Sequence, residues 1–114
     1  FQYITNKFND PQWYAPHGAS LQISVRSQHA GLLLLEFDYG VSGQGSRYTA
    51  KLNVKGQSGW QRVTLPPSDF SDGVGKPMET WGRPEQFSIT SAGLWHGPVP
   101  AFRNLQWVGG RFKP

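Results

Sequence analysis

Apolar and polar residues alternate with period two in short segments that are separated by glycine and proline. The chain of 114 residues contains 14 glycines and 9 prolines, and no stretch of eleven residues shows helical periodicity. Period-two alternation is typical of strands that bury one face. Because proline cannot donate to a strand ladder and glycine destabilises helices, the segments between are expected to be turns and loops. The sequence therefore predicts an all-β fold, either a sandwich or a barrel.

The alternation predicts six or seven strands. The segments that show it most clearly are residues 20–27, 31–39, 47–54, 60–65, 86–91 and 102–108. The glycine- and serine-rich stretch 40–46 predicts a long hairpin loop. Residues 68–85 are rich in Gly, Pro and Asp and predict a long loop with a short helical turn at 68–70, and loops of this length are often functional.

Length and composition favour one domain over residues 1–114. Seven Phe, five Trp and four Tyr can build a core, and the absence of Cys excludes disulfides and thiolate zinc sites. The longest apolar run, at 32–35, is too short to span a bilayer, so we expect a soluble protein. Since the sequence starts at Phe1, we expect it to be a processed or excised part of a longer protein.

One run of residues resembles a known family. Residues 59–70 read Gly-Trp-Gln-Arg-Val-Thr-Leu-Pro-Pro-Ser-Asp-Phe, after a Tyr-x-Ala-x-Leu strand and before Phe-Arg-Asn-Leu-Gln-Trp-Val at 102–108. This pattern resembles the β-sandwich (jelly-roll) carbohydrate-binding modules that are attached to secreted glycoside hydrolases and polysaccharide lyases. The likeness covers roughly residues 20–108.

The resemblance implies a single antiparallel β-sandwich of jelly-roll, galactose-binding-like type. It also implies an extracellular or cell-surface location and a covalently linked catalytic domain. The family often has a structural calcium near the terminal strands, where some members have Asp at the position of Asn104. A neutral amide weakens the case for calcium, and no other cofactor is expected.

Loop aromatics are the first candidates for a sugar site, because a sugar ring presents an apolar C–H face that can stack on a flat side chain. The aromatics that fall outside the strand pattern are Trp13, Tyr14, Trp81 and Trp95. The alternative reading is that each of them covers an open end of a small sandwich. Trp60 and Trp107 lie within strand patterns, so we expect both in the core.

Polar candidates lie along one predicted strand and in two loops. Arg47, Thr49, Lys51 and Asn53 form a ladder that is either a binding groove or an ordinary solvated face. Arg26 and Gln86 would extend the groove if their strands share its sheet. Arg47 and Lys51 could supply charge, Arg103 a forked donor, and His96 a hydrogen bond to a hydroxyl. The net charge of +4 favours an anionic ligand.

Catalytic and metal chemistry have little support. The three histidines lack metal-ligand spacing. Glu36 and Asp38 share a strand face about 7 Å apart, which suits glycoside hydrolysis, but neighbours on one strand cannot easily flank opposite sides of a bond. No phosphate loop, dinucleotide fingerprint or nucleophile elbow occurs. An oligonucleotide-binding barrel suits a basic all-β chain, but the cations are scattered singly.

These observations predict a monomeric, non-catalytic domain that binds a polysaccharide and holds an attached enzyme near its substrate. We expect neither nucleic acid nor membrane as a partner. The alternative function is a structural β-sandwich domain that packs on the catalytic domain of a glycoside hydrolase or lyase, with its exposed aromatics as interface anchors. Whether the polymer is neutral or anionic and sulfated remains open at this point.

Overall fold

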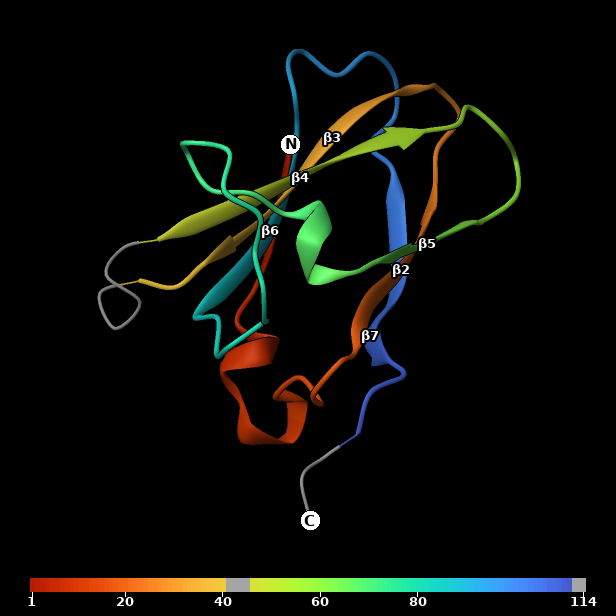
Figure 1. Ribbon diagram of the computed structural model, residues 1–114. Helices are drawn as coiled ribbons and strands as arrows, with labels where there is room; N and C mark the ends of the chain where they lie inside the picture. The colour runs from red at the N-terminus through yellow and green to blue at the C-terminus, as the bar shows by residue number, and fades with distance from the viewer. Residues whose placement is uncertain (41–45, 112–114) are drawn as a thin grey trace.

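The computed structural model describes residues 1–40 and 46–111, which form two antiparallel sheets (Figure 1). The seven strands are β1 (Gln2–Thr5), β2 (Ser20–Arg26), β3 (Gly31–Asp38), β4 (Arg47–Val54), β5 (Gln61–Leu65), β6 (Gln86–Ser91) and β7 (Ala101–Val108). Three short 3-10 helices complete the elements: η1 (Lys7–Asn9), η2 (Pro11–Trp13) and η3 (Pro67–Asp69). The predicted fold class, an all-β sandwich, is confirmed.

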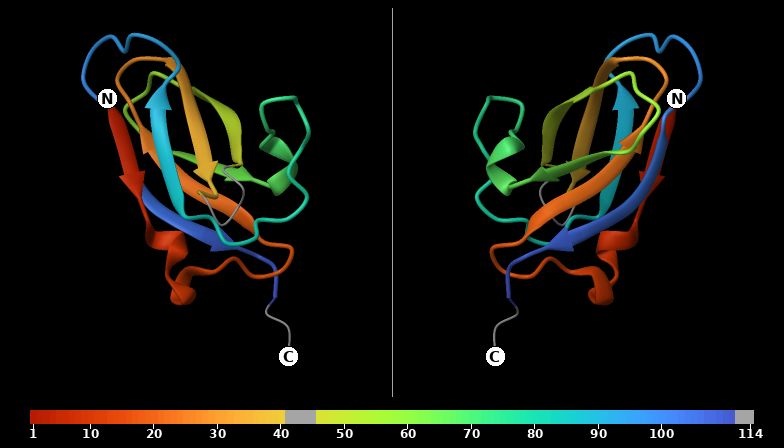
Figure 2. Two further views of the ribbon diagram at one scale, coloured as in Figure 1. Left: turned by 90° about the vertical axis from the view of Figure 1, so that its left-hand side faces the viewer. Right: turned by 90° about the vertical axis from the view of Figure 1, so that its right-hand side faces the viewer.

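The strand order is β1-β6-β3-β4 in the larger sheet and β5-β2-β7 in the smaller one. Only β3 and β4 are both consecutive in the chain and neighbours in a sheet, while every other connection crosses between the sheets. Figure 2 shows the η1–η2 segment at one end of the sandwich and the loop between β6 and β7 at the opposite end, near the N-terminus. Among the described residues, no helix has the length and apolar character that crossing a membrane would require.

The core lies between the inner faces of the two sheets. Alternation along β4 leaves Ala50, Leu52 and Val54 buried, as predicted, while Arg47 and Lys51 are exposed. The side chains that are almost completely buried come from both sheets and from flanking segments: Phe8, Leu21, Ile23, Val25, Leu33, Leu35, Phe37, Phe70, Phe87 and Ile89. Burial of these large apolar groups, at roughly 1.5–3 kcal/mol each, is the main stabilising contribution.

Trp81 belongs to this core, so its prediction as an exposed sugar platform is wrong. Its side chain is 3% exposed, and its indole Nε1 donates a hydrogen bond to the backbone oxygen of Ala19 over 2.8 Å. Its ring packs against Phe37, Phe70 and Trp107, with centroid distances of 4.9–5.5 Å. The long loop thus folds inward, and Trp81 covers an open end of the sandwich. This is the alternative role that the sequence allows for the loop aromatics.

Strand β7 contains an irregularity that decides which side chains face outward. Asn104 has φ of 59°, in the left-handed region that Asn tolerates better than most residues, and the pairing of β7 with β2 shifts register there. Trp107 lies opposite Leu21 and packs against Phe8 and the core, as predicted. In a regular strand Arg103 and Trp107 would lie on the same face, because they are an even number of positions apart. The bulge between them lets Trp107 point inward while Arg103 pairs with the outward-facing Ser24.

Candidate functional site

The outward face of the smaller sheet collects most of the polar side chains of β2, β5 and β7. Three arginines and one tryptophan dominate it, with amide and hydroxyl groups beside them. We call this surface the arginine face. Its residues are Trp60, which immediately precedes β5, Arg62 and Thr64 in β5, Gln22, Ser24 and Arg26 in β2, and Arg103 and Gln106 in β7.

Strand register brings the cationic part of this face together. Ser24 pairs with Arg62 on one side and with Arg103 on the other, so the three side chains form one row across the sheet. Arg26 lies two residues further along β2, on the same face. Ser24 is only 6% exposed although it points outward, which indicates that the longer neighbours fold over it.

The ring of Trp60 contacts two of these cations. The guanidinium carbon of Arg103 is 4.0 Å from the centroid of the indole, and that of Arg26 is 4.7 Å away. The core position predicted for Trp60 is therefore wrong, because its side chain is partly buried on the outer surface. The signal was present in the sequence: Trp60 alternates in phase with the polar Arg62 and Thr64, and not with Val63 and Leu65.

A row of hydrogen-bonded polar groups continues the face away from the cations. The amide nitrogen of Gln22 donates to the hydroxyl of Thr64 over 3.1 Å, and the amide nitrogen of Gln106 donates to the Gln22 side-chain oxygen over 3.2 Å. The three side chains are thereby held in fixed orientations with further donors and acceptors open to a ligand. Such groups suit the hydroxyls of a sugar.

Beyond Arg26 the face leads into a hollow of about 370 Å³ at the end of the sandwich. Its lining includes Arg26, Gln28, Gln57, Ser58 and Val99. None of these residues is acidic, so the hollow extends the arginine face without changing its charge.

The seven carboxylates of the chain all lie elsewhere. Strands β2, β5 and β7 contain no Asp or Glu, and the ion pairs within the described residues involve only Arg47. The acids are distributed over the N-terminal segment, the larger sheet and the long loop, as Asp10, Glu36, Asp38, Asp69, Asp72, Glu79 and Glu85. Within the described residues, the three arginines of the arginine face therefore have no ion-pair partner.

The predicted ladder of β4 has a different character. Arg47 lies 3.4 Å from Asp38 and 3.9 Å from Glu36, so its charge is balanced by the pair of acids considered for catalysis. Lys51 lies further along the same exposed edge strand. Gln86 is in the same sheet and faces the same way, since it pairs with Asp38, whereas Arg26 is in the other sheet.

A hollow of about 560 Å³ beside β4, here called the edge hollow, carries both signs of charge. Its lining includes the cations Arg47 and Lys51 and the acids Asp69 and Asp72. Backbone N–H groups of Lys76 and Val74 donate to the Asp72 carboxylate and hold its pKa below the ordinary value, so this acid stays charged near neutral pH. The cations of the ladder therefore share this hollow with two acids.

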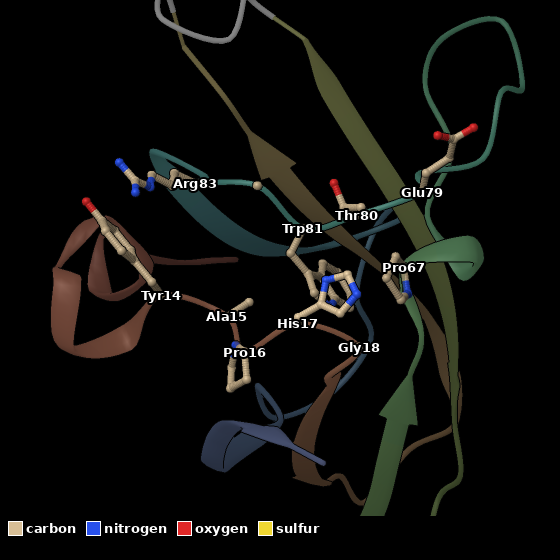
Figure 3. Close-up of a pocket in the computed structure, with 11 residues that line it drawn as sticks. Tyr14, Ala15, Pro16, His17, Gly18, Pro67, Glu79, Thr80, Trp81 and Arg83 are labelled. Carbon is tan, nitrogen blue, oxygen red and sulfur yellow. The ribbon is translucent and has the colours of Figure 1, made fainter. Parts of the chain in front are cut away.

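A third hollow, of about 510 Å³, lies at the end of the sandwich near η2 and is here called the end hollow (Figure 3). Tyr14 and Arg83 lie on one side, with the guanidinium carbon 4.7 Å from the ring centroid, while Glu79 lies on the other. His17 projects between them in front of the buried Trp81. This hollow also mixes acidic and basic groups.

The remaining predicted site residues are separate from the arginine face. Trp13 is exposed, but the Lys7 ammonium lies 3.7 Å from its ring centroid. Trp95 is partly buried: its Nε1 donates to the oxygen of Pro98, and its ring meets Phe1 edge-on at 5.7 Å. His96, its neighbour, is exposed. The structure thus scatters the predicted aromatic platforms over both ends of the sandwich.

Within the described residues, no three His, Asp or Glu side chains converge into a cluster that could hold a metal ion. Asn104, the position considered for calcium, is exposed at the bulge of β7. No protein-family model, no curated protein and no solved structure matches the chain. The fold defines a small antiparallel β-sandwich, and the likeness to carbohydrate-binding modules stays a prediction.

Proposed function

We propose that this protein is a non-catalytic polysaccharide-binding module and that the arginine face is its binding surface. The observation that carries the proposal is the composition of that face: cations, amides and hydroxyls surround one partly buried indole, and no carboxylate is present. A hydroxyl-rich polymer is recognised by many forked polar contacts of this kind.

The shape of the surface also supports an extended ligand. The face runs across three strands and continues into the hollow beyond Arg26. Neighbouring strands are about 4.8 Å apart, so the backbones of β5 and β7 are about 10 Å apart and the face is wide enough to contact more than one unit of a chain. An open sheet face accepts the middle of a polymer, whereas a closed pocket would select its end.

The module would act by raising the effective concentration of an enzyme at its substrate. In this proposal it is a monomer at the cell exterior or surface, covalently linked to a glycoside hydrolase or polysaccharide lyase. Neither nucleic acid nor membrane is its partner. No chemical step is assigned to its own side chains, and Glu36 and Asp38 serve as counter-ions of Arg47.

Native affinity electrophoresis tests the proposal and does not require the polysaccharide to be identified first. The protein is run through gels containing neutral and anionic algal, plant and microbial polysaccharides, at low and moderate salt, beside an inert protein of similar size. Retardation by one class of polymer is the expected result. Migration unchanged in every gel would contradict the proposal.

The alternative, a structural domain that packs on a catalytic domain, is favoured by one observation. Leu94 and Val99 are 86% and 61% exposed in the loop that also carries Trp95. Exposed apolar side chains in one loop are typical of contact surfaces. Replacing Leu94 alone with Ser would weaken association with the linked catalytic domain under this alternative. It would leave retardation by polysaccharide unchanged under the first, because Leu94 does not line the hollow beyond Arg26.

A further inference from the structure

The three residues Trp60, Arg26 and Arg103 are arranged as an oxyanion site. We infer that the indole of Trp60 is a positioning group that holds two guanidiniums, and that these bind sulfate or carboxylate groups on the polymer. The inference rests on the proposed function, which it narrows to anionic polysaccharides.

The stacking geometry leaves the hydrogen-bond donors of both arginines available. A guanidinium that lies over an aromatic ring uses its π face, whereas its five N–H groups lie in its own plane and point away from the contact. The guanidinium carbons at 4.0 and 4.7 Å from the Trp60 centroid fit this arrangement. The in-plane fork of an arginine matches the two oxygens of a carboxylate or sulfate.

The surroundings supply no anion for these donors. Arg47, on the other sheet, differs from these arginines because it forms ion pairs with two carboxylates within 4.0 Å. Arg26, Arg62 and Arg103 lie on strands without acids. Positive charges gathered on one indole repel each other, and an oxyanion between them would relieve that repulsion.

The arrangement also reduces the entropic cost of binding. A free arginine loses up to about 2 kcal/mol of side-chain entropy when it is fixed, and stacking on Trp60 restricts it before a ligand arrives. Strand pairing fixes the backbone, since Arg103 lies opposite Ser24 and Arg26 follows two residues later. The role of Trp60 differs from that expected of a sugar platform, because cations already cover the ring.

Calorimetric titration with defined polymers tests this inference. The probes are dextran, dextran sulfate and polygalacturonate, with a single-stranded oligonucleotide of matched charge as a fourth. Dextran sulfate and polygalacturonate represent the two sources of an oxyanion, and whichever binds more tightly identifies the source. We expect binding to at least one of these two, little binding to dextran, and weaker binding to the oligonucleotide.

Four variants separate a specific site from general attraction to a basic protein. Arg26→Gln and Arg103→Gln should each weaken binding about tenfold, in line with the loss of one charge-assisted hydrogen-bonded contact. Trp60→Leu should weaken it similarly without changing the net charge, and Trp60→Phe should restore most of the affinity. Since Trp60 lies outside the core, both Trp60 variants should melt close to the unmodified protein.

Arg83→Gln is the matched control, because it removes a guanidinium that is stacked on Tyr14 at the same 4.7 Å. If Arg83→Gln weakens binding as much as Arg103→Gln, the attraction is general and the inference is wrong. The inference is also wrong if dextran binds as tightly as the charged polymers, although the proposed function would then survive. The oligonucleotide could also bind most tightly of the four probes, and lose affinity in the Arg26 and Arg103 variants. That result would support the oxyanion site but contradict the proposed polysaccharide-binding function.

Discussion

The guanidinium of Arg103 lies 4.0 Å from the centre of the Trp60 ring, although the two residues are 43 positions apart in the sequence. They meet because β5 and β7 flank β2: Arg62 and Arg103 pair with the small Ser24 from opposite sides, and Trp60 lies two residues before Arg62 on the same face. The contact joins two outer strands of the sheet across its surface. The arginine face therefore depends on the pairing of all three strands.

The bulge at Asn104 should be sensitive to the residue that occupies it. Its φ of 59° costs a side-chain-bearing residue such as Ala about 1–2 kcal/mol, which Asn partly avoids and Gly avoids entirely. Asn104→Ala should lower the free energy of unfolding by about 1 kcal/mol, measured by urea denaturation, while Asn104→Gly should not lower it. Equal losses for both variants would show that the amide, and not the backbone conformation, matters at this position.

Gly31 should not tolerate even a methyl group. A Cβ at this position would clash with Cζ3 of Trp95 and lie 2.8 Å from its Cη2, well inside van der Waals contact. Gly31→Ala should therefore destabilise the fold by about 1–3 kcal/mol, as overpacking usually does. Gly93→Ala is the control, since nothing lies within 4 Å of the added atom there. A neutral Gly31→Ala would mean that the Trp95 loop moves freely away from β3.

Trp81 should be required for stability and not for binding. Trp81→Phe keeps an aromatic ring but removes the N–H that satisfies the backbone oxygen of Ala19, so a cost of about 1–3 kcal/mol is expected in chemical denaturation. Trp13→Phe, at an exposed indole, should cost much less. Polymer affinity of folded Trp81→Phe should equal that of the unmodified protein. A selective loss of affinity without a loss of stability would restore Trp81 as a ligand contact.

Tyr39 should make the fold sensitive to alkali. Burial, reinforced by the neighbouring Tyr48, raises the pKa of Tyr39, and its hydroxyl donates to the backbone oxygen of Trp81. The unfolded phenol ionises near pH 10, where the native one stays protonated, so unfolding releases a proton and stability falls as the pH rises above about 10. Below that pH the contribution of Tyr39 is complete.

Urea denaturation between pH 8 and 11 checks this behaviour. Tyr39→Phe should be less stable at pH 8, because it loses the hydrogen bond, yet its stability should decline less steeply above pH 10. Tyr3→Phe, at an exposed ring, should follow the unmodified protein. Parallel declines for Tyr39→Phe and the unmodified protein would contradict the assignment.

Local patterns were sufficient to predict most of the strands. Alternation along β4 and β6 predicts their limits without error, because apolar and polar residues alternate in both strands; in β4 the apolar residues are buried and the polar ones largely exposed. Strand β1 was missed since most of its side chains are exposed on both sides and leave no alternation to read. The inward turn of Trp81 also has no local signal, because it depends on where the long loop meets the open end of the core.

The candidate site could be predicted only in part. The sequence predicts Arg103 as a ligand-binding residue. It does not predict which residues lie beside Arg103, because these depend on the order of strands in the sheet, and alternation within a strand carries no information on that order. The bulge at Asn104 changes the face on which later residues of β7 lie, so strict alternation would have placed Arg103 beside Trp107. The outward position of Trp60 is the exception, because the sequence does predict it. Trp60 alternates in phase with the polar Arg62, and this pattern is a stronger signal than the general preference of strand tryptophans for the core.

The location of polymer binding is the central claim, and a heteronuclear NMR titration tests it most directly. The polysaccharide that retards the protein is added to labelled protein, and shifts are followed for backbone amides, the indole N–H groups and the arginine Nε–H groups. We predict the largest shifts at Trp60, Arg26 and Arg103, with those of Arg83 and Lys51 nearly unchanged. Shifts concentrated at Trp95 and His96, or in the end hollow around Tyr14, would contradict the assignment of the arginine face.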